Sequence, residues 1–460
     1  MATAPGILRV ILPKSYERLS RSSGSLLRSG WESSEFILAR SCDADGKEDT
    51  EPGRCRAERD SSFPTRGLRS ARMAGGGRSH VMPPVPALSQ ESVMDFEVGL
   101  ASAEESLSHE ADSLDLLLRR LRGRISPVLI GDREWEKVLE LAGRLPTSMA
   151  AFPFGFEFPL HESAPRANFA VSVIGGGQSA AFLQNVGQAE GAGRTAQSIA
   201  SLLAELGNEE SDLRRVAGRK LLLEYEIEPA RESAQSDPGF FLCPAPDVLA
   251  GDGRRSGDLA VVLDAVSSAT GRDPDIAERR EIEWVYRAME PETSVRGVGV
   301  FPSRGPGVRL AIEGFRDSSA LMAFLERAAW PGRRSVVAST VAPLEERAAF
   351  TWMGVQLDLR PDGVGPRLGL DFFPEESDWL KDIRPWRAFI EGIGAQGLAV
   401  PERLSALAES WPGAEMLFGK TGLFLHLRGI HHFELGLAGD EFDQVKAYAF
   451  LLIMGSRSQE

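Results

Sequence analysis

The chain repeats one arrangement five times: two strand-like segments joined by a turn, then one or two helical segments. In the strand-like segments apolar and polar residues alternate, as in the run that contains Phe154, Phe156 and Phe158. A period of two is typical of a β-strand that buries one face. Two such strands joined by a turn form an antiparallel hairpin. Five hairpins are predicted, at residues 152–173, 220–243, 295–314, 351–373 and 422–453.

The segments around the hairpins have the apolar spacing of amphipathic helices, with apolar residues three or four positions apart. A Trp-Pro-Gly sequence ends two of these segments, at 330–332 and at 411–413. Helices between hairpins must cover one face of the sheet. Helices are predicted at residues 103–122, 132–145, 194–206, 257–270, 275–289, 317–329, 384–395 and 401–410.

Ten antiparallel strands are close to the number at which a sheet curls or closes on itself. Closure removes the unpaired edges of the sheet. We therefore predict an α+β fold: a ten-stranded antiparallel β-barrel of five hairpins, surrounded by helices. The apolar strand faces would pack outward against the helices, and the polar faces would line the interior. Two smaller α+β layers are the alternative.

Residues 1–93 differ from the rest of the chain. They are rich in Ser, Arg, Gly and Pro and show little periodicity. Such a segment cannot bury enough apolar surface to offset the entropy that the chain loses on folding. We expect either a disordered extension or upstream sequence translated from an early start, because Met73, Met82 and Met94 all precede the globular part. Residues 94–460 are predicted to form a single α+β barrel domain.

The chain has a formal net charge of −14 at pH 7. The negative charge comes from residues 94–460, where 55 Asp and Glu outnumber 38 Lys and Arg. An acidic body repels nucleic-acid phosphates and anionic lipids, so neither nucleic acid nor a membrane is an expected partner. There is no uninterrupted run of 18 apolar residues that would predict a transmembrane helix. Three cysteines without a CxxC pair fit a reducing compartment, so we expect a cytoplasmic protein. The oligomeric state stays open.

The last predicted strand has two distinct faces. Val445, Ala447 and Ala449 form an apolar face for outer helices, whereas Lys446 and Tyr448 point toward the presumed interior. An ammonium and a phenol two residues apart can both donate to one phosphate group. Neighbouring carboxylates that satisfy both groups are the alternative.

This order of elements, with Lys446-Ala-Tyr448 on the last strand, resembles the ABBA-type (PT-barrel) aromatic prenyltransferase superfamily. The barrel of that superfamily consists of repeated α-β-β-α units with ten antiparallel strands, and its members place Lys-x-Tyr pairs on strands to shield a prenyl diphosphate. The resemblance covers about residues 130–455. It implies a transferase that moves a prenyl group to a small-molecule or peptide acceptor.

Inward-facing cations are the candidate ligands of a prenyl diphosphate. Arg309, Arg367 and Lys446 are the expected phosphate ligands, with Tyr448 beside Lys446. If these three cations converge in one pocket, prenyl transfer is favoured. If they scatter, or pair with Glu224, Glu226 and Asp371, prenyl transfer is to be rejected.

Three further residues are predicted to belong to the site. Glu157, on the first strand, is the expected catalytic residue, as the acceptor's hydrogen-bond partner or base. Trp352 could stack on an aromatic acceptor or shield a cation. Gln356 lies on the same strand as Trp352 and is expected to contact substrate.

The interior as a whole leans acidic, whereas a diphosphate cradle needs a cationic excess to offset desolvated phosphate charge. The alternative is therefore a protein without catalytic activity that kept the barrel but not the diphosphate site. Such a protein would bind a small molecule or a peptide, or serve as a scaffold. The predicted inward polar residues are Glu157, Lys220, Glu224, Glu226, Arg296, Arg309, Glu313, Gln356, Asp358, Arg367, Asp371, His426, His432 and Glu434.

The histidines near the end of the chain do not suggest a metal site. His426 and His432 share a strand face but stand roughly 20 Å apart at the usual rise, and His431 and His432 should point to opposite faces. No HExxH motif is present, so neither a metal nor a cofactor is expected. His432 beside Glu434 is either an acid/base pair or a satisfied polar pair.

Two glycine-containing stretches look like nucleotide motifs. Gly419-Lys420-Thr421 resembles the end of a P-loop, but position 414 lacks the first glycine and a helix, not a strand, is expected before it. We predict the turn into the ninth strand of the barrel. Residues 175–177 are three glycines after a strand without a Gly-x-Gly-x-x-Gly pattern, so a flexible loop at a barrel mouth is predicted.

Overall fold

The computed structural model describes residues 90–455, except 228–236, 245–247, 252, 254, 273–275, 305–306, 349, 361 and 375–383. Of the predicted extension, only residues 90–93 are among these, and they belong to the first helix. In this part of the chain, no helix combines the length and apolar character that crossing a membrane requires.

The described strands form one antiparallel sheet, and each predicted hairpin is present. The strands are β1 (Phe154–Pro159), β2 (Asn168–Ile174), β3 (Lys220–Tyr225), β4 (Gly239–Leu242), β5 (Ser294–Val300), β6 (Val308–Phe315), β7 (Phe350–Arg360), β8 (Gly363–Pro374), β9 (Gly413–Phe418), β10 (Leu423–Ala438) and β11 (Glu441–Gly455).

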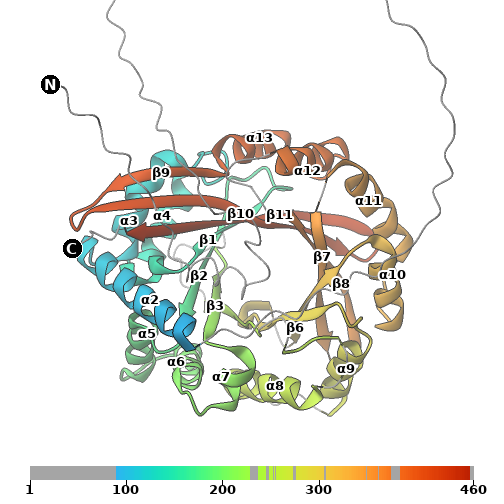
Figure 1. The fold of residues 1–460 in the computed structure, drawn as a ribbon. Helices are drawn as coiled ribbons and strands as arrows, with labels where there is room; N and C mark the ends of the chain where they lie inside the picture. The colour runs from blue at the N-terminus through green and yellow to red at the C-terminus, as the bar shows by residue number, and fades with distance from the viewer. Residues whose placement is uncertain are drawn as a thin grey trace, which may run out of the picture. The chain divides into compact units, whose positions relative to one another are not determined.

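The sheet closes on itself because β11 pairs with both β10 and β1. Residues of β1 and β11 lie opposite one another from Phe154 and Leu451 to Pro159 and Lys446. The ring contains ten strands and lacks only β9, which pairs with the N-terminal part of β10 and lies outside it (Figure 1). The predicted ten-stranded antiparallel barrel of five hairpins is therefore confirmed, and β9 is an addition to it.

Helices surround the barrel (Figure 1). They are α2 (Gln90–Glu110), α3 (Leu114–Leu121), α4 (Asp132–Ala142), α5 (Gln178–Gln188), α6 (Arg194–Gly207), α7 (Asp212–Ala217), α8 (Ser256–Thr270), α9 (Ile276–Arg287), α10 (Ser318–Arg327), α11 (Arg334–Arg347), α12 (Arg384–Ala395) and α13 (Pro401–Ser410). The described residues also include the 3₁₀ turns η1 (Arg122–Arg124), η2 (Thr147–Ala151) and η3 (Pro302–Arg304).

The helix prediction needs two corrections. The single helix predicted over 103–122 is divided into α2 and α3, because the chain leaves the helical conformation between Glu110 and Leu114. Helices α5, α7 and α11 lie outside the predicted set. In α11 the interior Pro343 and the β-branched residues hide the helical signal, since both lower intrinsic helix propensity.

The two strand faces separate as the alternation predicts. On β1 the ring of Phe156 lies 6.1 Å from that of Trp135 in α4, and the ring of Phe158 lies 6.0 Å from that of Trp411. Glu157, between them, points the other way and contacts Lys446 of β11. Apolar side chains therefore pack under the helices, and polar side chains occupy the lumen.

The connections differ between the two ends of the barrel. Each hairpin turn joins neighbouring strands at one end, which we call the hairpin mouth. The helices lead from one hairpin to the next at the other end, the helix-side mouth. Residues 175–177 lie at the helix-side mouth, where Ser179 at the start of α5 donates its backbone N–H to the carboxylate of Glu104 (3.1 Å).

The P-loop-like stretch binds a carboxylate of the protein itself. The backbone N–H of Lys420 donates to Glu110 (2.8 Å), and the hydroxyl of Thr421 donates to it as well (2.6 Å). The prediction of a turn before the next barrel strand is confirmed. A strand, β9, does precede the turn, contrary to expectation, but another strand and not a helix follows it. The turn therefore fastens α2 to the β9–β10 extension.

The Glu110 contact should contribute to stability in a pH-dependent way. Burial opposes ionisation of Glu110, but hydrogen bonds from Thr421, Lys420 and Arg120 outweigh it and lower the pKa to about 2. We expect Glu110→Gln to lower the free energy of unfolding by about 1–3 kcal/mol at neutral pH, measured by urea denaturation. The stabilisation is present above about 4.5, the ordinary pKa, and is lost as the pH falls toward 2. Glu105→Gln, an exposed position on the same helix, is the control and should have little effect.

Candidate functional site

A cavity of about 590 Å³ lies at the hairpin mouth. This volume is within the range of small-molecule sites. Its walls come from strand ends and hairpin turns all around the barrel, and six cationic side chains outnumber three carboxylates among them. The cations are Arg166, Arg304, Arg309, Arg360, Arg367 and Lys446, and the carboxylates are Glu157, Glu226 and Asp358. Although the interior as a whole leans acidic, this end of it is cationic.

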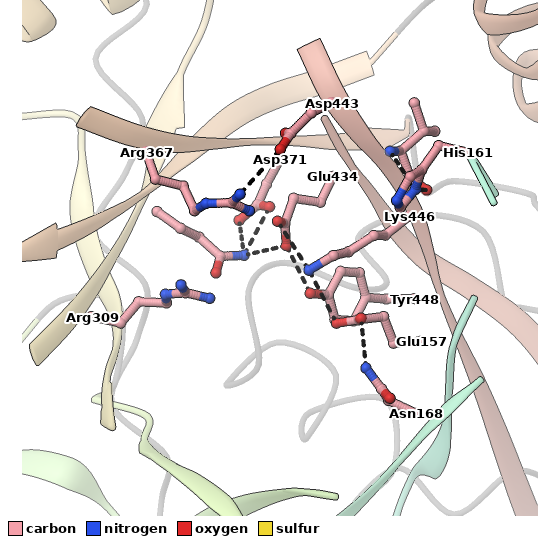
Figure 2. Close-up of polar contacts among 12 residues, drawn as sticks. Glu157, His161, Asn168, Arg309, Arg367, Asp371, Glu434, Asp443, Lys446 and Tyr448 are labelled. Carbon is pink, nitrogen blue, oxygen red and sulfur yellow. Dashed lines mark hydrogen bonds and ion pairs between the residues drawn. The ribbon is translucent and has the colours of Figure 1, made fainter. Parts of the chain in front are cut away.

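Lys446 occupies the centre of the polar interior. Its Nζ lies 3.5 Å from Glu157 and 3.4 Å from Glu434, so it bridges β1 and β10 from its own strand, β11 (Figure 2). Burial alone would lower the pKa of Lys446, but the two carboxylates outweigh burial and raise it. Lys446 therefore stays charged and fixes both carboxylates around it.

Glu157 is held by a second contact. Asn168, opposite it on β2, donates its Nδ2 hydrogen to Glu157 Oε1 (2.9 Å). The side-chain oxygen of Asn168 accepts from the backbone N–H of Ile227 (3.0 Å), which fixes the orientation of the amide. The carboxylate of Glu157 thus lies in the cavity wall with defined partners on two sides.

A chain of polar contacts continues below the cavity. Glu434 accepts from the Tyr448 hydroxyl (2.7 Å) and from Gln356 Nε2 (3.2 Å). The same Gln356 nitrogen donates to Asp371 (3.0 Å), which also pairs with Arg296 (2.6 Å). This network joins strands on opposite sides of the barrel, and Figure 2 shows Glu434, Tyr448 and Asp371 within it.

The two network carboxylates ionise very differently. Burial opposes the charge of Glu434, but Lys446, Arg309 and the Tyr448 hydroxyl outweigh it and lower its pKa to about 2. For Asp371, burial and the neighbouring Glu434 charge prevail over Arg296 and raise the pKa to about 6. Burial also raises the pKa of Tyr448. Proximity to Lys446 therefore decides which carboxylate remains charged.

The three predicted phosphate ligands line the same cavity. Each has a carboxylate partner: Arg309 binds Asp358 through two hydrogen bonds of 2.8 and 3.2 Å, and Arg367 donates to Asp443 (3.0 Å). None of the three is paired with Glu224, Glu226 or Asp371. The structure therefore brings these cations together, although each of them already has an ion partner.

The remaining predicted residues lie deeper. Gln356 lines a small recess beneath the cavity, and Tyr448 shares Glu434 with Lys446. Trp352 is not part of the cavity wall. Its ring is tilted against that of Phe373, with ring centroids 5.8 Å apart, and it lies roughly 20 Å along β7 from Asp358 at the usual strand rise. Trp352 is thus separated from the other predicted site residues.

Arg166, Arg304 and Arg360 are cavity residues that the sequence reasoning misses. Arg304 contacts Glu226 through Nε (2.7 Å) and lies in η3, whereas Arg166 lies in the turn between β1 and β2. Turn residues do not follow the alternation that assigns strand residues to the inside. The only available signal is an arginine beside a predicted hairpin turn.

The histidine prediction requires a correction. A bulge in β10 between Ile430 and His432 interrupts the alternation, so His431 and His432 do not point to opposite faces. Their Nδ1 atoms are 2.8 Å apart, and His432 is stacked against Tyr448 with ring centroids 4.2 Å apart. His432 Nε2 is near Asp371 (3.7 Å), while Glu434 is bound to other groups. In the described part of the chain no three His, Cys, Asp or Glu residues are grouped so that they could hold a metal ion.

Comparison with known proteins gives only distant likenesses. No protein-family model and no curated protein matches the chain. The 6-dimethylallyltryptophan synthase from Micromonospora olivasterospora, solved in complex with DMASPP and Trp, is 13% identical with a TM-score of 0.40, covering 78% of this chain and 96% of that chain. A second 6-dimethylallyl tryptophan synthase is 13% identical with a TM-score of 0.41, and the match covers 81% of this chain and 100% of that chain. The 5-dimethylallyltryptophan synthase from Streptomyces coelicolor is 13% identical with a TM-score of 0.36, covering 78% and 96%. Values of this size assign neither a family nor an activity.

Removal of Lys446 should test its role in holding the interior together. We expect Lys446→Met to lower the free energy of unfolding by about 3–5 kcal/mol, because two buried carboxylates lose their shared cation. The measurement is urea denaturation followed by circular dichroism. Adding Glu434→Gln to Lys446→Met should recover part of the loss, since one uncompensated charge is removed. If Lys446→Met matches the wild type in stability, the bridge makes no net contribution.

Proposed function

We propose that the barrel is a prenyltransferase-like enzyme that binds an organic diphosphate at the hairpin mouth and transfers its prenyl group to a small-molecule or peptide acceptor. The single observation that carries this proposal is the convergence of Arg309, Arg367 and Lys446 on one cavity, with further arginines in its wall. Charge-assisted hydrogen bonds from such a group of cations suit a diphosphate, which carries several acceptor oxygens.

In this site the cations perform the main electrostatic task. When the allylic carbon–oxygen bond breaks, the electron pair leaves with the diphosphate, and the developing negative charge is stabilised by positioned cations. Arg309 and Arg367 contribute from β6 and β8, and Lys446 contributes from β11. Ligand binding would be an ion exchange, in which phosphate oxygens replace Asp358 and Asp443 as partners of the two arginines.

The acceptor is proposed to lie against the opposite wall, next to Glu157. The carboxylate of Glu157 is in the cavity wall and is oriented by Asn168 and Lys446. It can accept a hydrogen bond from an N–H or O–H group of the acceptor. Trp352 is excluded from this proposed site, because it stands near the other end of its strand.

One observation favours the alternative of a non-catalytic binding protein. Lys446 and Tyr448, the pair that the resemblance assigns to the diphosphate, share the carboxylate of Glu434. A barrel whose interior ion pairs are stronger than its contacts with a diphosphate would not bind this donor. Diphosphate binding therefore separates the two candidates.

Diphosphate binding can be measured by thermal shift on the full chain with dimethylallyl diphosphate, geranyl diphosphate and inorganic pyrophosphate, each with and without magnesium. We expect a rise in Tm, because a ligand at 100 times its Kd stabilises the native state by about 2.7 kcal/mol. The shift should shrink as salt is added, since the contacts are ionic. The absence of a shift with every diphosphate would exclude prenyl transfer.

Arg367→Met is the variant that connects this shift to the cavity. Arg367 and its partner Asp443 are both partly exposed, so the loss of this pair should have little effect on folding. We expect the diphosphate affinity to fall about 10-fold or more, in line with the loss of one charge-assisted contact. Arg215→Met removes an arginine of α7 that pairs with Asp258 and lies outside the cavity wall, and it is the matched control. Equal affinities of the two variants would place the diphosphate elsewhere.

A further inference from the structure

Glu224 is the lumen carboxylate that the interactions described above leave out. It lies on β3 opposite Ala170 of β2, on the strand face that points into the barrel. Among the described residues, none forms a hydrogen bond or an ion pair with its carboxylate. The other lumen carboxylates each have a cationic partner: Glu157, Glu226, Glu313, Asp358, Asp371 and Glu434. An acidic group inside the lumen without a partner requires an explanation.

Glu224 lies close to the cavity, although it is not among the residues of the cavity wall. Glu226, two residues further along the chain and just past the end of β3, is in that wall, so Glu224 lies one layer below it. Glu224 is only partly buried, and so is Ala170 opposite it, whose methyl group leaves space beside the carboxylate. An acceptor that rests against Glu157 would therefore have Glu224 within the same part of the lumen.

The charges around Glu224 differ from those around Glu157. Burial in the lumen and the negative charge of Glu157 raise the pKa of Glu224 to about 7, although Arg304, Lys446 and Arg309 oppose this. The negative charge of Glu224 also contributes to the raised pKa of Tyr448, on β11. Glu157, in contrast, is bound directly by Lys446 and Asn168. Two carboxylates whose environments differ in this way commonly have separate acid and base roles.

We propose that Glu224 is the proton acceptor of the transfer reaction and that Glu157 holds the acceptor in place. This inference rests on the proposed function and extends it to an electron-rich aromatic acceptor. The π electrons of the acceptor ring form the new carbon–carbon bond as the diphosphate leaves with the electron pair of the broken carbon–oxygen bond. The electron pair of the ring C–H bond then returns to the ring, and its proton goes to the carboxylate of Glu224. An efficient base has a pKa near the working pH and must be free to take a proton, and Glu224 meets both conditions.

The first measurement is independent of any acceptor. Infrared difference spectra of the full chain, wild type minus Glu224→Gln, isolate the carboxyl band of Glu224 during a pH titration. We expect this band to convert from acid to carboxylate with a midpoint near 7. A midpoint at the ordinary value of 4.5 would overturn the proposal, because the group would then be fully charged and a weak base at neutral pH.

The second measurement is turnover of dimethylallyl diphosphate with tryptophan and tryptophan-containing peptides. Glu224→Gln should lower kcat about 100- to 10,000-fold, the usual contribution of a general base, with the affinity for inorganic pyrophosphate kept. Wild-type kcat should rise with pH through about 7, and Glu224→Asp should restore part of it. Glu313→Gln removes another lumen carboxylate with a raised pKa, near the helix-side end of β6, and is the matched control that should keep its turnover.

The outcomes separate this inference from the proposed function. If the wild type turns over and Glu224→Gln retains its kcat, only the role of Glu224 is overturned. If the wild type binds pyrophosphate but shows no turnover, prenyl transfer is overturned, and the role of Glu224 with it. If Glu224→Gln does not fold, the kcat–pH profile of Glu224→Asp is the deciding measurement. If residue 224 is the base, the pH at which kcat rises must change in Glu224→Asp. If the residue is purely structural, that pH must stay the same.

Discussion

The pairing of β11 with β1 on one side and with β10 on the other closes the barrel, and the interior depends on this closure. It joins segments that are almost 300 residues apart and removes the edges that an open ten-stranded sheet would expose. The register across the seam is strict, because a slip of one residue would turn Phe156 and Phe158 into the lumen and Glu157 toward the helices. The same register brings Lys446 next to Glu157.

A polar lumen carries an electrostatic cost that this barrel meets with paired charges. A charge removed from water is tolerated only when partners and hydrogen bonds replace the lost solvation. The contacts from Lys446 through Glu434 and Gln356 to Asp371 provide these partners across the barrel. The ion pairs also keep the cations in position at the hairpin mouth. A ligand that enters the cavity must therefore exchange its own anionic groups for the carboxylates already present.

Three glutamates of the interior differ in their contacts because their neighbours differ. Glu434 stays charged beside Lys446, with a pKa of about 2. Glu157 is fixed between Lys446 and Asn168, which suits it to orienting a ligand. Glu224 has no such partner in the described part of the chain, and burial together with the charge of Glu157 raises its pKa to about 7. The proposed chemistry follows from these environments, since the three side chains are chemically identical.

The sequence by itself determined the hairpins and the outward and inward strand faces, because alternation and turn residues are local signals, and it favoured a closed ten-stranded barrel. The closure itself is a pairing of β1 with β11, which only the tertiary structure decided. The sequence also determined that Lys446 and Tyr448 point inward. Only the tertiary structure decided which charges meet. It placed Arg304 in the cavity wall from a turn, where no periodicity exists, and it moved Trp352 away from the site through its position along β7. It also left Glu224 without a partner among the described residues, which depends on distances across the lumen that no local pattern records.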